Sequence, residues 1–552
     1  MSSPTETPRS VSTYAPFGIL LLVLVGCAVR GYFTLEGLER PVDVDSYRDI
    51  GYVQALLDGN WWGDPLYGGE YRFYSPLFHG LGAVTAWVTG LSPMTLWLHA
   101  SPWFNLLAPL TFFEMTRRLF GLPAAAVATV IFALNGVLYP PWISAGYSPW
   151  PIICILTLPL FFVGVSLIHR HARSQAIGDA AVIGLVGGLA FLAHPFPAIL
   201  LTVVVVATVV AMRGLSLRTA AWLAVFGAVE LVLALIVLGP LFVKYRLHTL
   251  NFEPSFWVDP LLSTSTWNMR LGIVAYDLLG LALAAIGLLL FLQGRLADID
   301  RRRPAILVVW IGLGLLLLVR HVACALADAA AGVCRIPIVP VHHAHFYLQA
   351  ALSCVLGYAF WKLLAWSYDT IRRVGQPWPV GVLLLVVLCA GVAGSVASME
   401  RILPRTYDFR ARQSVLGNDD KFDLQTYRWI LRNTSPDDLF VTQTPPVDVE
   451  DPAFVVMATG RRLVAAPIFF SHPYVDWREK DSRREQYMAS LQHRDARFCN
   501  LLAEAGSDAK VFFVVGNDAT VKSRIVEPVL RTGFYTIFQL RSDGSCSAAA
   551  LR

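Results

Sequence analysis

The residues with the clearest capacity for chemistry lie in a polar stretch, residues 41–76, that follows the first apolar segment of the chain. Asp43 and Asp45 form an Asp-x-Asp pair at its start. Such a pair can hold a divalent cation, Mg²⁺ or Mn²⁺, against a diphosphate, or one carboxylate can take a proton from an acceptor hydroxyl. The alternative is that both carboxylates are solvated in a loop or cap a helix that starts at Ser46.

Glu70 and Arg72 lie later in the same stretch, in the sequence GGEYRFYSP. Two glycines allow a sharp backbone turn before them. The two side chains could face a substrate or form an ordinary surface salt bridge. Between these groups, a short amphipathic turn near residues 50–57 precedes Trp61 and Trp62. This pattern predicts a loop on a membrane surface, with its aromatics at headgroup level and its carboxylates turned towards water.

His194 stands in the sequence AHPFP, between two short apolar runs that suit a hairpin of helices. The two prolines enforce the break between these runs. A histidine near the membrane is costly unless it is hydrogen-bonded or faces a wet cavity, which favours a substrate-binding role. The alternative is a simple helix C-cap.

A second group of histidines, His342, His343 and His345, follows Arg335. Three close imidazoles suggest zinc, but adjacent helical histidines point in different directions, and no carboxylate or cysteine completes a ligand set. Contacts to a phosphate or a sugar are the preferred interpretation. Another basic group consists of Lys244, Arg246 and His248. It could bind a lipid-linked phosphate or simply anchor a helix at the headgroups.

The composition places these residues in a membrane protein. The chain has 552 residues, of which 55% are hydrophobic and 15% charged, and its mean hydropathy is +0.55. Apolar runs of roughly 17–25 residues recur, the length that a helix needs to cross a bilayer. The net charge of +5 fits positively charged inner loops. No basic stripe is interleaved with aromatics, so a nucleic-acid partner is not expected.

The basic residues of the short loops predict the topology. With residues 17–33 as a first span running outwards, each short basic loop falls on the cytoplasmic side if the chain has about eleven spans. Residues 75–90 then form a helix in the outer interface. The other spans are expected at residues 96–120, 124–138, 151–168, 180–192, 198–212, 220–242, 271–293, 305–322, 346–366 and 380–396.

The predicted architecture is therefore a polytopic α-helical membrane domain, residues 1–400, with an acidic first outer loop at 34–95, and a small periplasmic α/β domain at 401–552. In that second domain, residues 422–433 read as a helix. Strands are expected within 437–443, 461–470 and 509–516, and residues 527–541 read as a helix end followed by a strand. The N-terminus is expected in the cytoplasm, with the chain in a bacterial inner membrane.

Cysteine positions agree with this topology. Four cysteines lie in apolar spans and are expected to be inert: Cys27, Cys154, Cys354 and Cys389. The other four fall on the outer side, where disulfides Cys324–Cys334 and Cys499–Cys546 or four unpaired thiols are the alternatives.

The chain resembles the GT-C glycosyltransferases, which use polyprenyl-phosphate sugars and include protein O-mannosyltransferases, lipid A aminoarabinose transferases and oligosaccharyltransferase catalytic subunits. Asp43 and Asp45 match the acidic motif of their first outer loop, and YSPLFHGLGAV is similar to the interfacial helix that follows it. RRLFG and GGLAFLAHPFPAILL resemble a helix end and a broken helix pair. Two departures from the family are visible. Ser75-Pro76 stands where the mannosyltransferases have a His-Pro-Pro triplet. The Trp-Trp-Asp signature of the oligosaccharyltransferases lies in their soluble domain, whereas WWGD lies in the first loop of this chain.

The resemblance implies transfer of a sugar from a polyprenyl-phosphate carrier to a glycan, lipid or protein acceptor at the periplasmic face. Asp43 is then the expected base, with Asp45 second. Basic residues would offset charge on the departing phosphate, and the candidates are Lys244, Arg246, Arg320 and Arg335. Two other classes remain: a transporter or flippase of lipid-linked sugars, and a non-catalytic GT-C-fold protein in envelope polysaccharide assembly. Few charges in the spans and no evident repeat argue against a transporter.

Overall fold

The computed structural model describes residues 9–42, 44–138, 146–251, 289, 305–317, 341–373, 407–417, 422–443, 452–491, 501, 505–506 and 509–541. The chain divides into two compact units. The first comprises Met1–Glu36, Ala100–Leu233 and Asp259–Arg412, and the second comprises Gly37–His99, Ala234–Val258 and Gln413–Arg552. Most of the predicted first outer loop thus shares a unit with the C-terminal region. The domain boundary at residue 400 stays a prediction.

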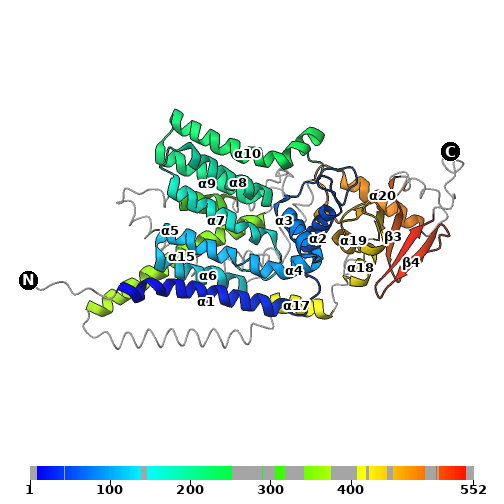
Figure 1. Ribbon diagram of the computed structural model, residues 1–552, viewed down its shortest axis with the longest axis horizontal. Coiled ribbons are helices and arrows are strands. Elements are labelled where there is room, and N and C mark those ends of the chain that lie inside the picture. The colour runs from blue at the N-terminus through cyan, green and yellow to red at the C-terminus, as the bar shows by residue number, and fades with distance from the viewer. Residues whose placement is uncertain are drawn as a thin grey trace, which may run out of the picture. The chain divides into compact units, whose positions relative to one another are not determined.

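The first unit is a bundle of apolar helices (Figure 1). Its helices include α1 (Arg9–Leu35), α5 (Leu107–Phe120), α6 (Leu122–Leu138), α7 (Ile153–His171), α8 (Ile177–Ala193), α9 (Pro195–Arg213) and α15 (Val341–Arg373). Helix α6 packs against α1, α5 and α15, while α7 packs against α5, α8 and α9. At Gly357 of α15 a Cβ atom would lie 2.4–2.5 Å from atoms of Ala128, so glycine permits this close approach to α6.

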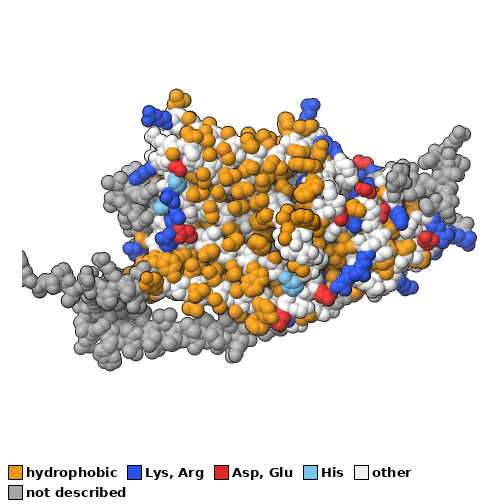
Figure 2. Space-filling view, viewed as in Figure 1, with side chains coloured by type: hydrophobic (Ala, Val, Ile, Leu, Met, Phe, Trp, Pro, Cys, Tyr) orange, Lys and Arg blue, Asp and Glu red, His pale blue; other side chains and the backbone are white. Residues whose placement is uncertain are grey.

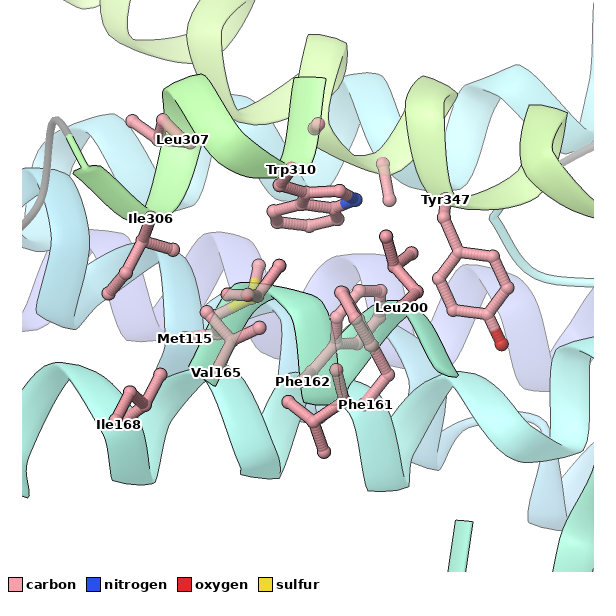
Figure 3. Packing of buried hydrophobic residues seen from close by; sticks show 14 of the residues in the cluster. Met115, Phe161, Phe162, Val165, Ile168, Leu200, Ile306, Leu307, Trp310 and Tyr347 are labelled. Atoms are coloured by element: carbon pink, nitrogen blue, oxygen red, sulfur yellow. The ribbon is translucent and has the colours of Figure 1, made fainter. Parts of the chain in front are cut away.

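The core of the bundle is built from large side chains that meet from several helices (Figure 3). Phe161 and Phe162 of α7 lie beside Trp310, which belongs to the apolar helix Ala305–Leu317. The Phe161 and Trp310 ring centroids are 4.9 Å apart and tilted edge to face, the arrangement that aromatic quadrupoles favour. Tyr347 of α15 also packs edge to face against Phe161, with ring centroids 5.0 Å apart.

The outside of the bundle is also apolar. Figure 2 shows hydrophobic side chains over most of the visible face of these helices, with charged side chains towards the helix ends. Leu21 and Leu22 of α1 are 62% and 72% exposed, which suits lipid rather than water. Among the described residues, four helices are long and apolar enough to cross a membrane, or five if a bent pair counts as one span. The polytopic helical class is thus supported, and the number eleven and the orientation stay predictions.

One predicted span is interrupted. Residues 96–120 were expected to form a single helix, but the structure has α4 (Pro93–Phe104) and α5, separated by a turn at Asn105 and Leu106. Pro102 near the end of α4 weakens the helical hydrogen bonding there. In the turn, the buried side-chain amide of Asn105 donates hydrogen bonds to the carbonyls of Ser148 and Trp150.

The segment expected in the outer interface forms helix α3 (Leu77–Thr89). It bends by 111° from the Pro93–Phe120 segment that follows. One face of α3 buries His79, Ala83 and Ala86, whereas Trp87 and Val88 are 79% and 70% exposed. The helix carries no Asp, Glu, Lys or Arg, so its exposed face is suited to the lipid headgroup region.

Lipid contact of α3 can be tested by fluorescence. The contribution of Trp87 to the fluorescence is the difference in emission between the wild type and the Trp87→Phe variant. We expect brominated phospholipids in nanodiscs to quench this contribution, because an interfacial indole lies within reach of the acyl chains. The matched control is Trp477→Phe, in helix α20 (Trp477–Ser490) of the C-terminal region. If the lipids quench the emission of Trp87 and that of Trp477 equally, an interfacial position of α3 is contradicted.

The second unit centres on α2 (Val44–Leu57), which is a full helix rather than the short turn expected. It packs against α3 and against α19 (Ala453–Ala458). At Gly51 a Cβ atom would lie 2.0 Å from the carbonyl oxygen of Met457, so only glycine allows α2 to approach the backbone of α19 this closely. The start of the predicted first outer loop is therefore in direct contact with the C-terminal segment of the chain.

The C-terminal part of this unit contains a five-stranded mixed sheet, of order β2-β1-β3-β5-β4. Strands β1 (Leu439–Thr442), β2 (Arg462–Leu463) and β3 (Val511–Gly516) are parallel, with Leu439 opposite Val511. Strand β5 (Tyr535–Leu540) pairs antiparallel with β3 and with β4 (Val526–Arg531). Helix α18 (Leu424–Asn433) is capped by Asp423, as the predicted helix at 422–433 requires.

The helix end predicted within residues 527–541 is wrong, because the structure has the hairpin of β4 and β5 there. Pro528 made a strand less expected, but β4 lies at the edge of the sheet, where a residue without an N–H is tolerated. Residues 532–534 connect the two strands. Helix α20, which packs against β1, was not predicted. Its composition is strongly polar, so it lacks the apolar periodicity that marks a helix.

Two cysteines, Cys27 of α1 and Cys354 of α15, are buried thiols outside any disulfide, as predicted for inert residues in apolar spans. Cys154 is half-buried in α7, within the apolar run predicted for it. Cys389 and the four cysteines of the two possible disulfides lie outside the described residues.

Candidate active site

The described part of the acidic pair lies in the first turn of α2. Asp45 is half exposed, with its side chain 54% accessible, and its Oδ1 atom accepts a hydrogen bond of 2.8 Å from Nη1 of Arg48. A carboxylate in this turn is favoured by the helix dipole. Asp43 lies outside the described residues, so its role as the expected base stays a prediction.

A buried charge network adjoins Asp45. Arg48 donates to Asp49 Oδ1 from Nε and Nη2, both at 2.9 Å. His79 of α3 places its Nε2 atom 3.0 Å from the same oxygen. The Asp49 and His79 side chains are each 1% exposed, and the His79 ring stacks on Tyr52. The expectation that the carboxylates of this loop all face water is therefore wrong for Asp49.

The network fixes the charge states of its members. Burial opposes ionisation of Asp49, but Arg48 and the hydrogen bond from His79 outweigh it and lower the pKa of the carboxyl. Burial lowers the pKa of His79 in spite of its acidic partner. We therefore assign a carboxylate to Asp49 and a neutral imidazole, with its proton on Nε2, to His79. The cation of Arg48 is favoured by Asp49, which raises its pKa against the effect of burial.

Arg72 is a buried cation of a different kind. Its residue is 6% exposed, and its guanidinium lies over the ring of Tyr52, 5.1 Å from the centroid. Within the described residues its Nε and Nη2 atoms have no hydrogen-bond acceptor, and it forms no ion pair. Burial lowers its pKa, and the nearby groups Tyr52 and Asp64 only partly oppose this. The salt bridge between Glu70 and Arg72, one of the two alternatives for this pair, is thus not formed.

Asp64 is a second carboxyl that the sequence placed in water and the structure buries. It is 2% exposed and accepts hydrogen bonds from the hydroxyl of Tyr52 at 2.7 Å and from the N–H of Leu66 at 2.8 Å. Burial raises the pKa of Asp64 even with these donors. Tyr52 therefore contacts an acidic and a basic side chain: its hydroxyl donates to Asp64, and the guanidinium of Arg72 lies over its ring.

Glu70 is paired with the end of α10 (Leu217–Tyr245). Its Oε2 atom accepts from Nζ of Lys244 at 2.6 Å and from the hydroxyl of Tyr245. Partial burial opposes ionisation of Glu70, but these two donors outweigh it and lower its pKa. The ring of His472 is 5.5 Å from that of Tyr245, and its Nε2 atom is 2.7 Å from the carbonyl of Tyr71.

The structure thus joins Glu70 and Lys244, two predicted site residues that are 174 positions apart. Arg246, just beyond α10, is exposed and has a left-handed backbone with φ of 52°. The partners Tyr245 and His472 were not predicted, because a pairing over this distance leaves no local pattern in the sequence.

His194 caps a helix in the first unit. It ends α8 and begins α9, and its Nδ1 atom accepts a hydrogen bond of 3.2 Å from the N–H of Phe196. The break between two helices at this position was predicted. His194 occupies the C-cap position of α8, where its backbone N–H donates to the carbonyl of Ala190, but its side chain caps the N-terminus of α9. A role of His194 in substrate binding stays a prediction.

The remaining predicted residues are described only in part. Arg320 and Arg335 lie outside the described residues, and His342, His343 and His345 belong to the first turns of α15, with side chains that the structure does not describe. In the described part of the chain, no group of three His, Cys, Asp or Glu side chains could hold a metal ion.

Comparison with solved structures identifies the fold in which this site lies. ArnT from Cupriavidus metallidurans bound to undecaprenyl phosphate is similar over 95% of this chain and 98% of its own, with a TM-score of 0.54 and 14% identity. Its apo state covers the same shares, with a TM-score of 0.53 and 15% identity. ArnT is an aminoarabinose transferase of the GT-C superfamily. The chain has a GT-C fold.

A second GT-C protein agrees with this assignment. The apo oligosaccharyltransferase from Archaeoglobus fulgidus matches 93% of this chain and 70% of its own length, with a TM-score of 0.50 and 12% identity. No protein-family model matches the chain, and neither does any curated protein sequence. The GT-C resemblance predicted from the sequence is therefore confirmed through the fold, across nearly the whole chain.

Proposed function

We propose that this GT-C protein is a membrane glycosyltransferase, which moves a sugar from a polyprenyl-phosphate carrier to a glycan, lipid or protein acceptor. The observation that carries the proposal is Arg72, a buried cation whose Nε and Nη2 donors lack acceptors in the described structure. Such an arrangement is costly unless an anion satisfies it. A phosphate on the carrier has the charge and the acceptor oxygens that a guanidinium fork matches.

The donor side of the reaction then needs stabilisation of charge. The bond between the sugar and the carrier phosphate breaks, and the phosphate leaves with the bonding electron pair. Arg72 would bind the departing phosphate, supported by the basic residues predicted for this role, which are Lys244, Arg246, Arg320 and Arg335. ArnT has been crystallised with undecaprenyl phosphate, and this chain matches the ArnT fold along its length, which favours the same class of lipid here.

The acceptor side needs a base. A hydroxyl acceptor loses its proton as the new glycosidic bond forms, and the carboxylate of Asp43 or Asp45 would accept that proton. Asp45 fits this role because its side chain is half exposed and forms an ion pair with Arg48. Glu70 and His194, together with the histidines at 342, 343 and 345, would contribute contacts to the sugar or the phosphate.

A divalent cation at Asp43 and Asp45 is the one cofactor that the sequence predicts. Among the described residues Asp45 has a cationic partner, Arg48, at Oδ1, and no group of three metal-ligating side chains is present. The residues that the structure describes therefore do not form a metal site, and no step of the proposed reaction passes through a metal. Location in a bacterial inner membrane, with the site on the periplasmic face, is part of the proposal.

The direct test is transfer in a defined system. Purified protein in nanodiscs is supplied with undecaprenyl-phosphate sugars that carry radiolabelled hexose, pentose or aminoarabinose, together with a cell-envelope fraction as acceptor. We expect one sugar to move to the acceptor with release of undecaprenyl phosphate. Translocation of labelled lipid without release of the carrier would favour the flippase alternative, and binding without turnover would favour the non-catalytic one.

A further inference from the structure

Arg48 is held on all sides within the second unit. One edge of its guanidinium, formed by Nε and Nη2, contacts Asp49 Oδ1. Its faces lie against the rings of Tyr74 and Phe470, with centroids 4.3 Å and 5.1 Å from Cζ. Because a guanidinium is planar and rigid, these contacts leave little freedom in the direction of the remaining nitrogen, Nη1.

Nη1 is the atom that contacts Asp45, at 2.8 Å. Asp49, which fixes the opposite edge, is fixed in turn by His79 from α3. A chain of contacts therefore runs from α3 through Asp49 and Arg48 to the half-exposed carboxylate of Asp45.

The contact between Arg48 and Asp45 contributes little to folding. Ion pairs with one exposed partner typically add little to stability, because water competes for the charge. Asp49 alone already compensates the buried cation of Arg48. The contact between Arg48 and Asp45 has its main effect on geometry, since a hydrogen bond of 2.8 Å from a fixed guanidinium favours one orientation of the carboxylate.

We propose that Arg48 is a positioning residue, which holds the Asp45 carboxylate for the transfer reaction and is itself held by Asp49 and His79. The inference rests on the proposed function, because it assigns Asp45 a part in the reaction. Arg48 does not need to touch either substrate, and its effect on the reaction passes through Asp45.

The test uses Arg48→Lys and a matched control. Lysine keeps the charge but cannot contact Asp45 and Asp49 with two fixed edges. The control is Arg461→Lys: Arg461 is 3% exposed and pairs with Asp58 just beyond the other end of α2, at 2.7 Å, far along the helix from Asp45. We expect kcat for sugar transfer to fall roughly 100-fold in Arg48→Lys, the effect of a misplacement of about 1 Å, with KM for the donor unchanged. Arg461→Lys is expected to keep the wild-type kcat.

A double-mutant cycle separates positioning from general damage. If Arg48 acts through Asp45, the Asp45→Asn/Arg48→Lys protein should be no slower than Asp45→Asn alone. If the two losses multiply, Arg48 acts independently of Asp45, and the inference is overturned. Wild-type kcat in Arg48→Lys, or an equal loss of kcat in Arg461→Lys, overturns it as well.

A second pair of variants covers the case in which Arg48→Lys does not fold. His79→Gln retains a side-chain N–H that can reach Asp49, whereas His79→Leu removes it. We expect most of the kcat to persist in His79→Gln and a loss in His79→Leu; equal rates would overturn the inference. A wild-type protein that transfers no sugar from any polyprenyl-phosphate donor overturns the proposed function and this inference together. Normal wild-type transfer with unchanged rates in the variants overturns the inference alone.

Discussion

Replacing Arg72 with methionine is expected to weaken binding of undecaprenyl phosphate roughly 30-fold or more while leaving the protein at least as stable as the wild type. Arg72 is buried, and in the described structure its Nε and Nη2 atoms have no acceptors. An apolar side chain of similar volume removes the cost of burying this charge, so folding should not suffer. Removal of a buried cation from a charge-assisted contact with phosphate should weaken binding by about 2 kcal/mol or more, which is roughly 30-fold.

The matched control is Arg484→Met. Arg484 is 6% exposed, as Arg72 is, but it contacts Asp481 and the carbonyl of Thr442. Its replacement leaves a carboxylate and a carbonyl without their donor, so this variant should lose stability and keep lipid binding. The measurements are thermal unfolding in detergent and titration with undecaprenyl phosphate. Unchanged affinity in Arg72→Met, or a loss of stability as large as that in Arg484→Met, would show that Arg72 has a structural role instead.

The fold was predictable to the extent that it follows from local patterns. Apolar runs of membrane length predict helices because the bilayer requires internal hydrogen bonding, and α7 and α9 fall where the runs are. Short β-branched and aromatic runs likewise predicted β1 and β3. The break between α4 and α5 was missed although Pro102 was a local signal for it; the contacts of Asn105 with residues 148 and 150 left no local pattern.

The site was less predictable for a related reason. A sequence shows that Asp49 and Asp64 are acidic, and an acidic residue in a polar stretch is ordinarily solvated. The structure buries both, because Arg48, His79 and Tyr52 provide donors that replace water. His79 offered one signal: it is the only ionisable side chain within the apolar segment at residues 77–89. A histidine in such a segment requires a buried partner, and Asp49 is that partner.

The Asp43→Asn protein is expected to lose roughly 10²–10⁴-fold in transfer rate while still folding and binding its lipid donor. An acceptor hydroxyl is a poor nucleophile near neutral pH, so a positioned base lowers the barrier. The carrier phosphate is already a good leaving group, so its side of the reaction needs charge stabilisation rather than an acid. Asparagine keeps the size and most hydrogen bonds of aspartate but cannot accept the proton.

The matched control for this variant is Asp58→Asn, just beyond the end of α2. It alters a carboxylate of the same loop that pairs with Arg461 at 2.7 Å, so it should reduce stability but leave the transfer rate unchanged. Transfer from a polyprenyl-phosphate sugar is measured with purified protein, and donor binding is followed separately. Turnover at the wild-type rate in Asp43→Asn would remove this residue as the base and leave Asp45, the carboxylate that Arg48 holds. The same rate in the Asp43→Asn/Asp45→Asn protein would show that neither carboxylate takes the proton, and would leave the acidic pair with no part in the chemistry.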